Sequence, residues 1–508
     1  MPRTLAAARS LAGTRTKAST RPQHTPPALV SGLSLSPSSW AFGNVDITTG
    51  PSDKVITVTA TGGTQSVIGT ASITGTGMSI VSDGVSGHTL AVGNSLSLTV
   101  RFDPSADGAV SGTLSIPSDA PATPTTAAIT GTGITYSGDP QWALDLRTAL
   151  ATPTYGNTYT VPTGAGYTDG TNCSVNVAAF INAKANGASP SNHTKIVFGA
   201  GTYTFSGRGA DATHGGIVLD TRSNLTIDCS AATFVMAHTR PATSSYAYMF
   251  FIRGSSYIRI LSPTVLGGAV LTGTDSAYSE GDEKQGGVFV AAGSSYVEVS
   301  GGSFDDMLGW PYIVSGNASG KTLSNNIWIH GGTLAVGGVS NFATVGGDYV
   351  LFEDNLECQD ATWAAMDFEP DDASGHCRHY LIQRNTFRRW GWRGAGHTDW
   401  WLGLGKGYTG PPYATMNDIT VRDNTIHEIQ SHGQGMVIDA TGLQPFSDVV
   451  ITGNVQTPAR TVAGSPMSFA NFGNLTVTGN TCTTVSHVAL VGSDTNTSGV
   501  HTLTPNTV

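Results

Sequence analysis

Short units of the form apolar-x-apolar recur along the chain from residue 225 onward, and most end three residues later in Asn. The regular copies end at Asn355, Asn385, Asn424, Asn454 and Asn480. Looser copies, in which Ser, Pro or Gly replaces the Asn, start at Leu225, Ile258, Val297 and Ile327. Alternation of this kind predicts a strand with one buried face. Because so short a strand buries that face only by stacking on its neighbours, copies spaced 23 to 39 residues apart predict a solenoid.

The Asn that closes each unit predicts a tight bend. Its short polar side chain tolerates the left-handed backbone region and bonds to nearby backbone groups. Since the same residue type recurs at the same place in five units, we expect a ladder of Asn side chains along successive coils.

Three segments ahead of the repeats carry a family resemblance. They are Asp169–Asn172, the helix-like Val175–Lys184 and the strand-turn segment Ile196–Phe205. Together with the repeats they make residues 165–508 resemble the right-handed parallel β-helix superfamily of pectate lyases and phage tailspikes. The resemblance implies a helix that caps the first coil and a β-helix over residues 169–508 with about nine or ten coils. It does not fix an activity, since this scaffold hosts lyases, hydrolases, epimerases and non-catalytic binders.

Residues 33–134 have a different pattern, in which short β-branched runs alternate with Gly, Ser and Asp turns. About seven strands in such a length predict a β-sandwich. The segment resembles bacterial immunoglobulin-like modules of the choice-of-anchor and ASH type at Trp40–Val45, Val100–Pro104, Gly112–Ile116 and Ile129–Gly133. The whole chain is therefore predicted to be all-β, with a basic flexible arm at 1–32 and a linker at 135–168. For the module we expect a spacer or docking role, with sugar binding as the alternative.

Charge is distributed unevenly along the chain. The first 32 residues hold five of the 25 Lys and Arg residues and no acid, so 20 basic and 35 acidic residues remain in the rest. An acidic body disfavours nucleic acid as a partner. No apolar run is long enough to cross a membrane, and the basic arm lacks the apolar core of a secretory signal. A transit-like peptide or a misassigned start codon are the alternatives.

The five cysteines are dispersed and odd in number. This argues against a disulfide framework and a zinc site, although Cys358 and Cys377 are close enough in sequence to meet across adjacent coils.

Candidate chemistry concentrates around Ala365–Asp372. Alternation predicts Met366 and Phe368 inward and the acids Asp367 and Glu369 outward. Counted from the closing Asn of their coils, Asp367 and His397 are both at position 12, and Glu369 and Asp399 at position 14, so we expect these pairs to stack on neighbouring coils. Asp439 is expected to continue this column of stacked side chains on the next coil. Stacked carboxylates have pKa values that differ, which suits a general acid and base. The alternatives are solvated or structural acids, such as Asp residues that cap backbone amides in a turn, and a Ca²⁺ site that also uses Asp371 and Asp372.

Aromatic and arginine side chains crowd the same region. Aromatic faces suit sugar rings, and Arg pairs with carboxylate or sulfate groups. The candidate substrate-binding residues are Trp363, Arg388, Arg389, Trp390, Trp392, Arg393, Trp400, Trp401, Tyr408 and Asp439. The alternative is Trp packing over an insertion loop, with Arg balancing local acids. A pectate-lyase catalytic Arg or a polygalacturonase Asp-Asp pair cannot be matched residue by residue.

The sequence is compatible with three functions. The first is a virion-surface protein, similar to a phage tailspike or fibre, that binds and degrades a bacterial surface polysaccharide. The resemblance implies a homotrimer, and the arm and module would contact other virion proteins. The second is a secreted or cell-surface polysaccharide lyase or glycoside hydrolase. The third is a non-catalytic decoration protein. An enzyme of either kind would use paired carboxylates and no obligatory cofactor.

Overall fold

The computed structural model forms two compact units, residues 1–135 and 136–508. It describes residues 31–47, 51–119, 124–134, 138–205, 216–236, 247–267, 285–307, 309–315, 322–335, 339–361, 364–370, 375–390, 401–404, 416–427, 438–440, 446–457, 467–469, 474–482 and 501–502.

The first unit is a β-sandwich of two four-stranded sheets and a two-stranded ribbon. One sheet has the order β1-β3-β8-β6, the other β2-β10-β9-β5, and the ribbon pairs β4 with β7. The strands are β1 (Ser31–Ser36), β2 (Ser39–Asp46), β3 (Ser52–Gly62), β4 (Ser66–Val67), β5 (Ser72–Ile73), β6 (Met78–Asp83), β7 (Thr89–Leu90), β8 (Ser95–Phe102), β9 (Gly108–Ile116) and β10 (Thr125–Ile134). All pair antiparallel except β2 with β10. The predicted sandwich is confirmed, while its relation to immunoglobulin-like modules stays a prediction.

The second unit is a right-handed parallel β-helix built from three sheets, which we call I, II and III. Sheet I contains β11 (Thr154–Val161), β12 (Asn192–Phe198), β15 (Ser223–Asp228), β18 (Ser256–Leu261), β21 (Ser295–Ser300), β24 (Asn325–His330), β27 (Gly347–Glu353), β30 (Cys377–Gln383), β33 (Met416–Arg422), β36 (Phe446–Thr452), β39 (Leu475–Thr478) and β41 (His501–Thr502). Sheet II contains β13 (Gly201–Phe205), β16 (Ala232–Met236), β19 (Thr264–Leu266), β22 (Ser303–Asp305), β25 (Thr333–Leu334), β28 (Glu357–Ala361), β31 (Thr386–Trp390), β34 (Thr425–His427), β37 (Val455–Thr457) and β40 (Thr481–Cys482). Sheet III contains β14 (Ile217–Asp220), β17 (Ala247–Arg253), β20 (Gln285–Ala291), β23 (Tyr312–Val314), β26 (Ser340–Thr344), β29 (Ala364–Phe368), β32 (Leu402–Leu404), β35 (Ile438–Ala440) and β38 (Met467–Phe469).

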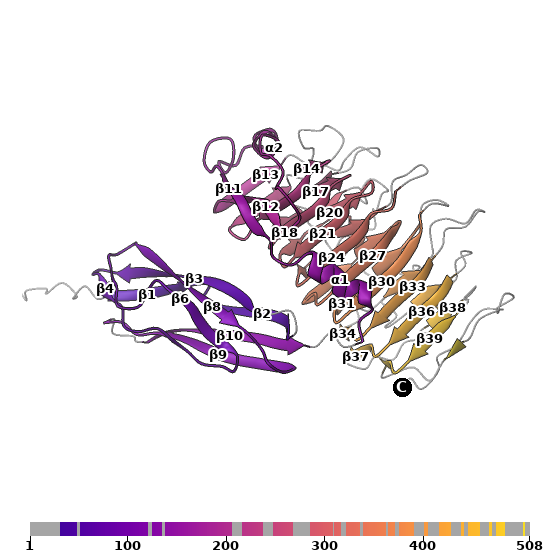
Figure 1. Cartoon of the computed structure of the whole chain (residues 1–508), viewed down its shortest axis with the longest axis horizontal. Helices are drawn as coiled ribbons and strands as arrows, with labels where there is room; N and C mark the ends of the chain where they lie inside the picture. Colours follow the sequence, from indigo (N-terminus) through magenta and orange to yellow (C-terminus); the bar gives the residue numbers. More distant parts are fainter. Residues whose placement is uncertain are drawn as a thin grey trace, which may run out of the picture. The chain divides into compact units, whose positions relative to one another are not determined.

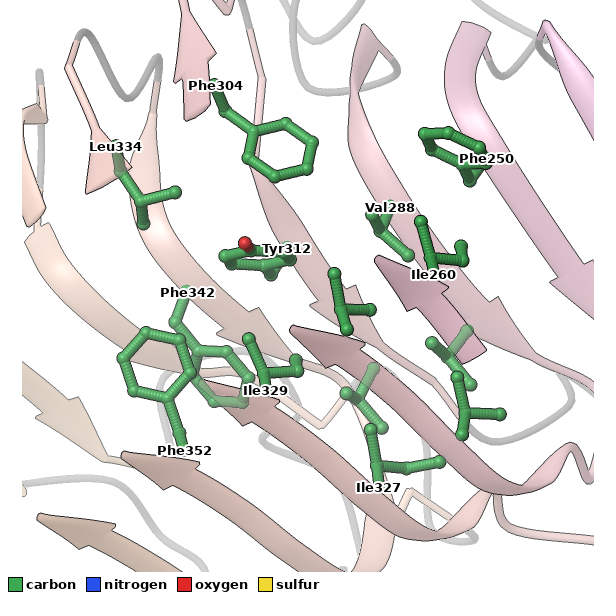
Figure 2. Close-up of a cluster of buried hydrophobic side chains, with 14 of the residues drawn as sticks. Phe250, Ile260, Val288, Phe304, Tyr312, Ile327, Ile329, Leu334, Phe342 and Phe352 are labelled. Carbon is green, nitrogen blue, oxygen red and sulfur yellow. The ribbon is translucent and has the colours of Figure 1, made fainter. Parts of the chain in front are cut away.

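Within the described residues, nine coils contribute a strand to each sheet in turn, and a tenth contributes β39 and β40. The predicted number of coils is confirmed. In β11 to β34, β36 and β39, at least one apolar side chain per strand points inward, and these side chains form one core along the β-helix. Figure 2 shows part of this core, where Phe304, Tyr312, Phe342 and Phe352 pack with aliphatic side chains from neighbouring coils. Burial of each such side chain contributes about 1.5–3 kcal/mol.

The predicted Asn ladder is present where sheet I turns into sheet II. Asn385 donates from Nδ2 to Oδ1 of Asn424 at 3.0 Å and to the Phe352 carbonyl at 3.0 Å. The same bonds link the remaining pairs from Asn355 to Asn480. The bend itself is made by the preceding residue, as at Arg384 with φ 53°. The expected left-handed Asn is therefore corrected: the bend residue takes that conformation, and this directs the Asn side chain into the buried corner.

A second ladder occupies the corner between sheets III and I in the early coils. The Ser255 hydroxyl accepts from the Arg222 amide at 2.9 Å and donates to the Leu219 carbonyl at 3.0 Å. One coil on, the Ser294 hydroxyl accepts from the Ser255 amide at 3.2 Å. Both side chains are buried, so these hydroxyls satisfy backbone groups that water does not reach.

The two helices found in the described residues belong to the second unit. Helix α2 (Ser174–Asn182) buries Val177 and Ile181 in the core at the first coil, which confirms the predicted cap. Helix α1 (Gln141–Ala149) lies along sheet I beside β24 and β27 (Figure 1). Because α1 and β11 both fall in 135–168, that segment is part of the β-helix unit rather than a linker. Neither helix is long and apolar enough to cross a membrane.

Cys173, Cys229, Cys358 and Cys377 are all buried free thiols. The considered bond between Cys358 and Cys377 is therefore absent. Burial raises the pKa of Cys173 and of Cys377 to about 12, so both thiols are protonated at neutral pH.

Candidate functional site

Asp367 lies in β29, between two core residues. Met366 and Phe368 point into the β-helix, as alternation predicted, so Asp367 points to the outer face of sheet III. That face is covered at this point, because Asp367 is only 5% exposed. The alternative of a solvated surface acid is therefore wrong for Asp367. Removing a carboxylate from water costs free energy unless the group has interaction partners, and Asp367 does have partners.

The strand register defines which residues neighbour Asp367 on adjacent coils. Asp367 pairs with Ala343 before it and with Gly403 after it, and Gly403 pairs in turn with Asp439. Asp439 therefore lies in the same column as Asp367, with Gly403 between them. Since neighbouring strands lie about 4.8 Å apart, the backbone positions of Asp367 and Asp439 are separated by about 9.6 Å. The position between them is glycine and carries no side chain.

The predicted register of Asp367 with His397 is wrong. Gly403, the true partner, lies 18 residues after Asn385, whereas Asp367 lies 12 after Asn355. The connection between β31 and β32 is longer than the connection between β28 and β29. The number of residues after the closing Asn therefore does not predict which residues pair in sheet III. Both His397 and Asp399 lie outside the described residues. Glu369 follows β29 directly and is half-buried, and its amide donates to the Thr344 carbonyl at 2.8 Å.

Arg388 lies on sheet II, not on the sheet that carries Asp367. Its Nε atom is 3.2 Å from Oε1 of Glu357, and both side chains are about one-third exposed. Register places Gln359 and His427 beside it. This arrangement agrees with the alternative in which Arg balances a local acid.

Trp401 is fully buried in the main core, where it packs edge-on against Phe387 with ring centroids 5.8 Å apart. Its expected role in sugar binding is therefore corrected, because the ring belongs to the core inside the β-helix and not to the outer face of a sheet. The side chains of Arg389 and Trp390 in β31 and of Asp439 in β35 are not described. Outside the described residues lie Trp363, Trp392, Arg393, Trp400 and Tyr408.

Apolar residues form a second cluster on the outer face of sheet III, in coils before the acids. In the column of Asp367, this cluster contains Phe251, Phe289, Ile313 and Ala343, all at most 7% exposed. Trp310 packs with them. The column thus changes from apolar to acidic at Asp367. The sequence analysis did not identify this cluster, although the unbroken apolar run in β17 is typical of a strand buried on both faces.

Sheet I carries two buried ionic groups that the sequence pattern did not reveal. In the first, Arg259 and His330 contact Glu298, with His330 Nε2 3.1 Å from its carboxylate. Burial acts to raise the pKa of Glu298, but the Arg259 charge and the hydrogen bond with His330 outweigh it and hold the pKa at about 2. In the second, Arg147 of α1 binds Glu353. Neither has a short-range signal, because the partners are distant in sequence.

The described residues hold no group of three or more His, Cys, Asp or Glu side chains able to bind a metal ion. Asp371 and Asp372, two of the four candidate Ca²⁺ ligands, lie outside that part of the chain. A Ca²⁺ site stays a prediction.

No protein-family model and no curated protein matches the chain. Among solved structures, the family 28 exopolygalacturonase of Yersinia enterocolitica is similar with a TM-score of 0.39 and 12% identity, over 80% of this chain and 76% of that one. The secreted serine protease VesC of Vibrio cholerae matches with a TM-score of 0.19 and 19% identity, over 24% of this chain. The chain spans about a quarter (26%) of that protease. Similarities at this level carry no argument about activity.

Proposed function

We propose that this protein binds a polysaccharide along sheet III and cleaves its glycosidic bonds with carboxylates from the column of Asp367 and Asp439. The observation that carries the proposal is the register of that column, in which two acid positions flank Gly403. Gly403 places no side chain of its own between the two acids. The burial of Asp367 supports a role beyond solvation of the surface.

The chemistry requires two carboxyl groups in different protonation states. In an inverting hydrolysis, one carboxylic acid gives its proton to the leaving glycosidic oxygen, while the other carboxylate takes a proton from the water that attacks the anomeric carbon. Carboxyl groups about 6.5–9.5 Å apart leave room for that water. The backbone separation of about 9.6 Å between Asp367 and Asp439 is compatible with this range. Glu369, two residues beyond Asp367, is the alternative partner, at about 6.7 Å along the strand.

The test measures product release from a panel of bacterial surface polysaccharides and polyuronates. Release of reducing ends indicates hydrolysis, whereas unsaturated products indicate a lyase. Asp367→Asn and Asp439→Asn are expected to lower the rate at least about a hundredfold, as for loss of a general acid or base. Glu357→Gln, which removes an outer-face acid on sheet II, is the matched control. Binding without cleavage by the wild type, or normal cleavage by both Asn variants, would overturn the catalytic proposal.

For the setting, we propose a homotrimeric virion appendage that the basic arm and the β-sandwich attach to other virion proteins. The acid-free basic segment ahead of a separate folded unit supports this choice over a secreted enzyme. Light scattering of the full chain is expected to give the mass of a trimer. A monomer that still degrades polysaccharide would favour the secreted lyase or hydrolase. A chain that binds no polysaccharide would favour the decoration protein.

A further inference from the structure

Residues 138–153, which we call the strap, cross sheet I from a late coil to the first. At one end, the Gly138 carbonyl accepts from Arg422 in β33 at 3.0 Å, and Asp139 binds the same guanidinium. Helix α1 then lies beside β27 and β24. After the strap, β11 pairs with β12 at the first coil. The strap therefore holds the start of the second unit near the eighth coil, although the β-helix itself begins at β11.

Arg147 is the main polar contact of the strap. Its Nε and Nη2 atoms donate to the two carboxylate oxygens of Glu353 at 2.8 and 2.6 Å, and Nη2 also donates to Asp139 at 2.6 Å. The side chains of Asp139 and Glu353 are both fully buried. Truncating one partner of such a pair is strongly destabilising.

The apolar contacts of the strap lie on one side of α1. Ala143, Leu146 and Leu150 are buried against Leu351 and Leu381 on the outer face of sheet I. The opposite side of α1 is exposed at Gln141, Asp145 and Thr148. Trp142 adds an edge-on contact with Tyr349, with ring centroids 5.7 Å apart. The helix is too short to be stable in water without these contacts.

Removal of the strap would leave the β-helix face with its polar groups paired. The Glu353 carboxylate would still accept hydrogen bonds from Arg384 at 2.6 Å and from Gln383 at 2.8 Å. Arg422 would still donate a hydrogen bond to the side-chain oxygen of Gln383 at 2.8 Å. The hydrogen bonds between β24, β27, β30 and β33 involve no strap residue. Local unfolding of the strap therefore does not require unfolding of the sheet.

We propose that the strap is a releasable latch that sets where the connection to the first unit leaves the β-helix. With the strap bound, the chain leaves at β33; with the strap released, it leaves at β11. Sheet I places eight strand spacings between these two points, about 38 Å along the β-helix. The latch thus sets the length of the free connection ahead of the β-helix, and it does so independently of sheet III.

Hydrogen–deuterium exchange on the full chain tests the proposal. In Arg147→Met and in Leu146→Ala, amides of α1 are expected to exchange at least about tenfold faster than in the wild type, because each variant removes a buried contact of the strap. Amides of β27 and β30 are expected to keep their protection. Thr148→Ala, on the exposed side of α1, is the matched control and is expected to exchange as the wild type does.

Small-angle X-ray scattering on the same proteins supplies a second measurement. Both strap variants are expected to give a scattering curve that differs from those of the wild type and Thr148→Ala, since the connection lengthens on release. Unchanged exchange in α1, an unchanged scattering curve, or loss of protection in α1 together with β27 would each show that the strap is a fixed part of the β-helix and would overturn the proposal.

Discussion

Asn385 and Asn424 lie 39 residues apart in sequence and are joined by two hydrogen bonds, from the Asn385 backbone amide and from its side-chain nitrogen, both to Oδ1 of Asn424 at 3.0 Å. One side-chain oxygen thus satisfies two buried donors of the previous coil. This arrangement makes the ladder sensitive to loss of a single member, since every Asn serves both of its neighbours.

Asn424→Ala is expected to destabilise the β-helix by about 3–5 kcal/mol. The substitution leaves two donors on Asn385 and the Ile382 carbonyl without their partner, and each unsatisfied buried group costs about 1–3 kcal/mol. Denaturant unfolding followed by circular dichroism measures the change. Asn474→Ala, at an exposed position, serves as control and is expected to shift stability by less than about 0.5 kcal/mol. Equal effects of the two substitutions would contradict a stabilising ladder.

His193 is expected to make the protein less stable as pH falls from about 6.5 to about 4. Burial, together with Arg259, lowers its pKa from 6.5 to about 4, so the unfolded chain takes up a proton in this window before the folded chain does. Stability is therefore highest above pH 6.5 and decreases through the window by up to about 3 kcal/mol. His193→Gln is expected to flatten this part of the stability–pH curve. An unchanged slope would show that other groups carry the acid sensitivity.

Glu298 extends the acid sensitivity to lower pH. Its folded pKa is about 2, below the ordinary value of 4.5, so its stabilising contribution is complete above about pH 4.5 and disappears as pH falls towards 2. Glu298→Gln is expected to lower stability at pH 7, because it leaves the buried Arg259 without an anionic partner. The difference between variant and wild type should shrink below pH 4. A difference that does not depend on pH would indicate lost packing instead of lost charge.

Trp401→Ala is expected to destabilise the fold by about 3–5 kcal/mol through the cavity that it creates in the core. Trp401→Phe, which keeps a ring against Phe387, should recover most of that loss. Polysaccharide binding by Trp401→Phe should equal that of the wild type. Weaker binding by this well-folded variant would return Trp401 to the substrate-binding surface.

Gly403→Val tests the carboxylate column without changing any charge. The branched side chain would occupy the position between Asp367 and Asp439 and is expected to reduce cleavage at least about tenfold. Thermal unfolding of the same variant separates blockage from misfolding. Full activity in a folded Gly403→Val protein would favour Glu369 as the partner of Asp367.

The repeat pattern was sufficient to predict the β-helix because every coil contains a similar strand and corner, as at Asn385 and Asn454. The prediction did not extend to the register of Asp367, since sheet III follows connections of variable length. It also missed Arg147 with Glu353. Two residues 206 apart leave no periodic signal in the sequence, and only the folded chain brings them together.

The Asn ladder also implies that the length of the β-helix is adjustable in whole steps. Asn424 donates to Asn454 and Asn454 donates to Asn480 through the same atoms, so successive coils make the same contact at this corner. Excision of residues 425–454 would bring Asn424 directly onto Asn480 with an identical set of bonds. A chain of this design can lose or duplicate a coil as a single genetic event and still close its interior.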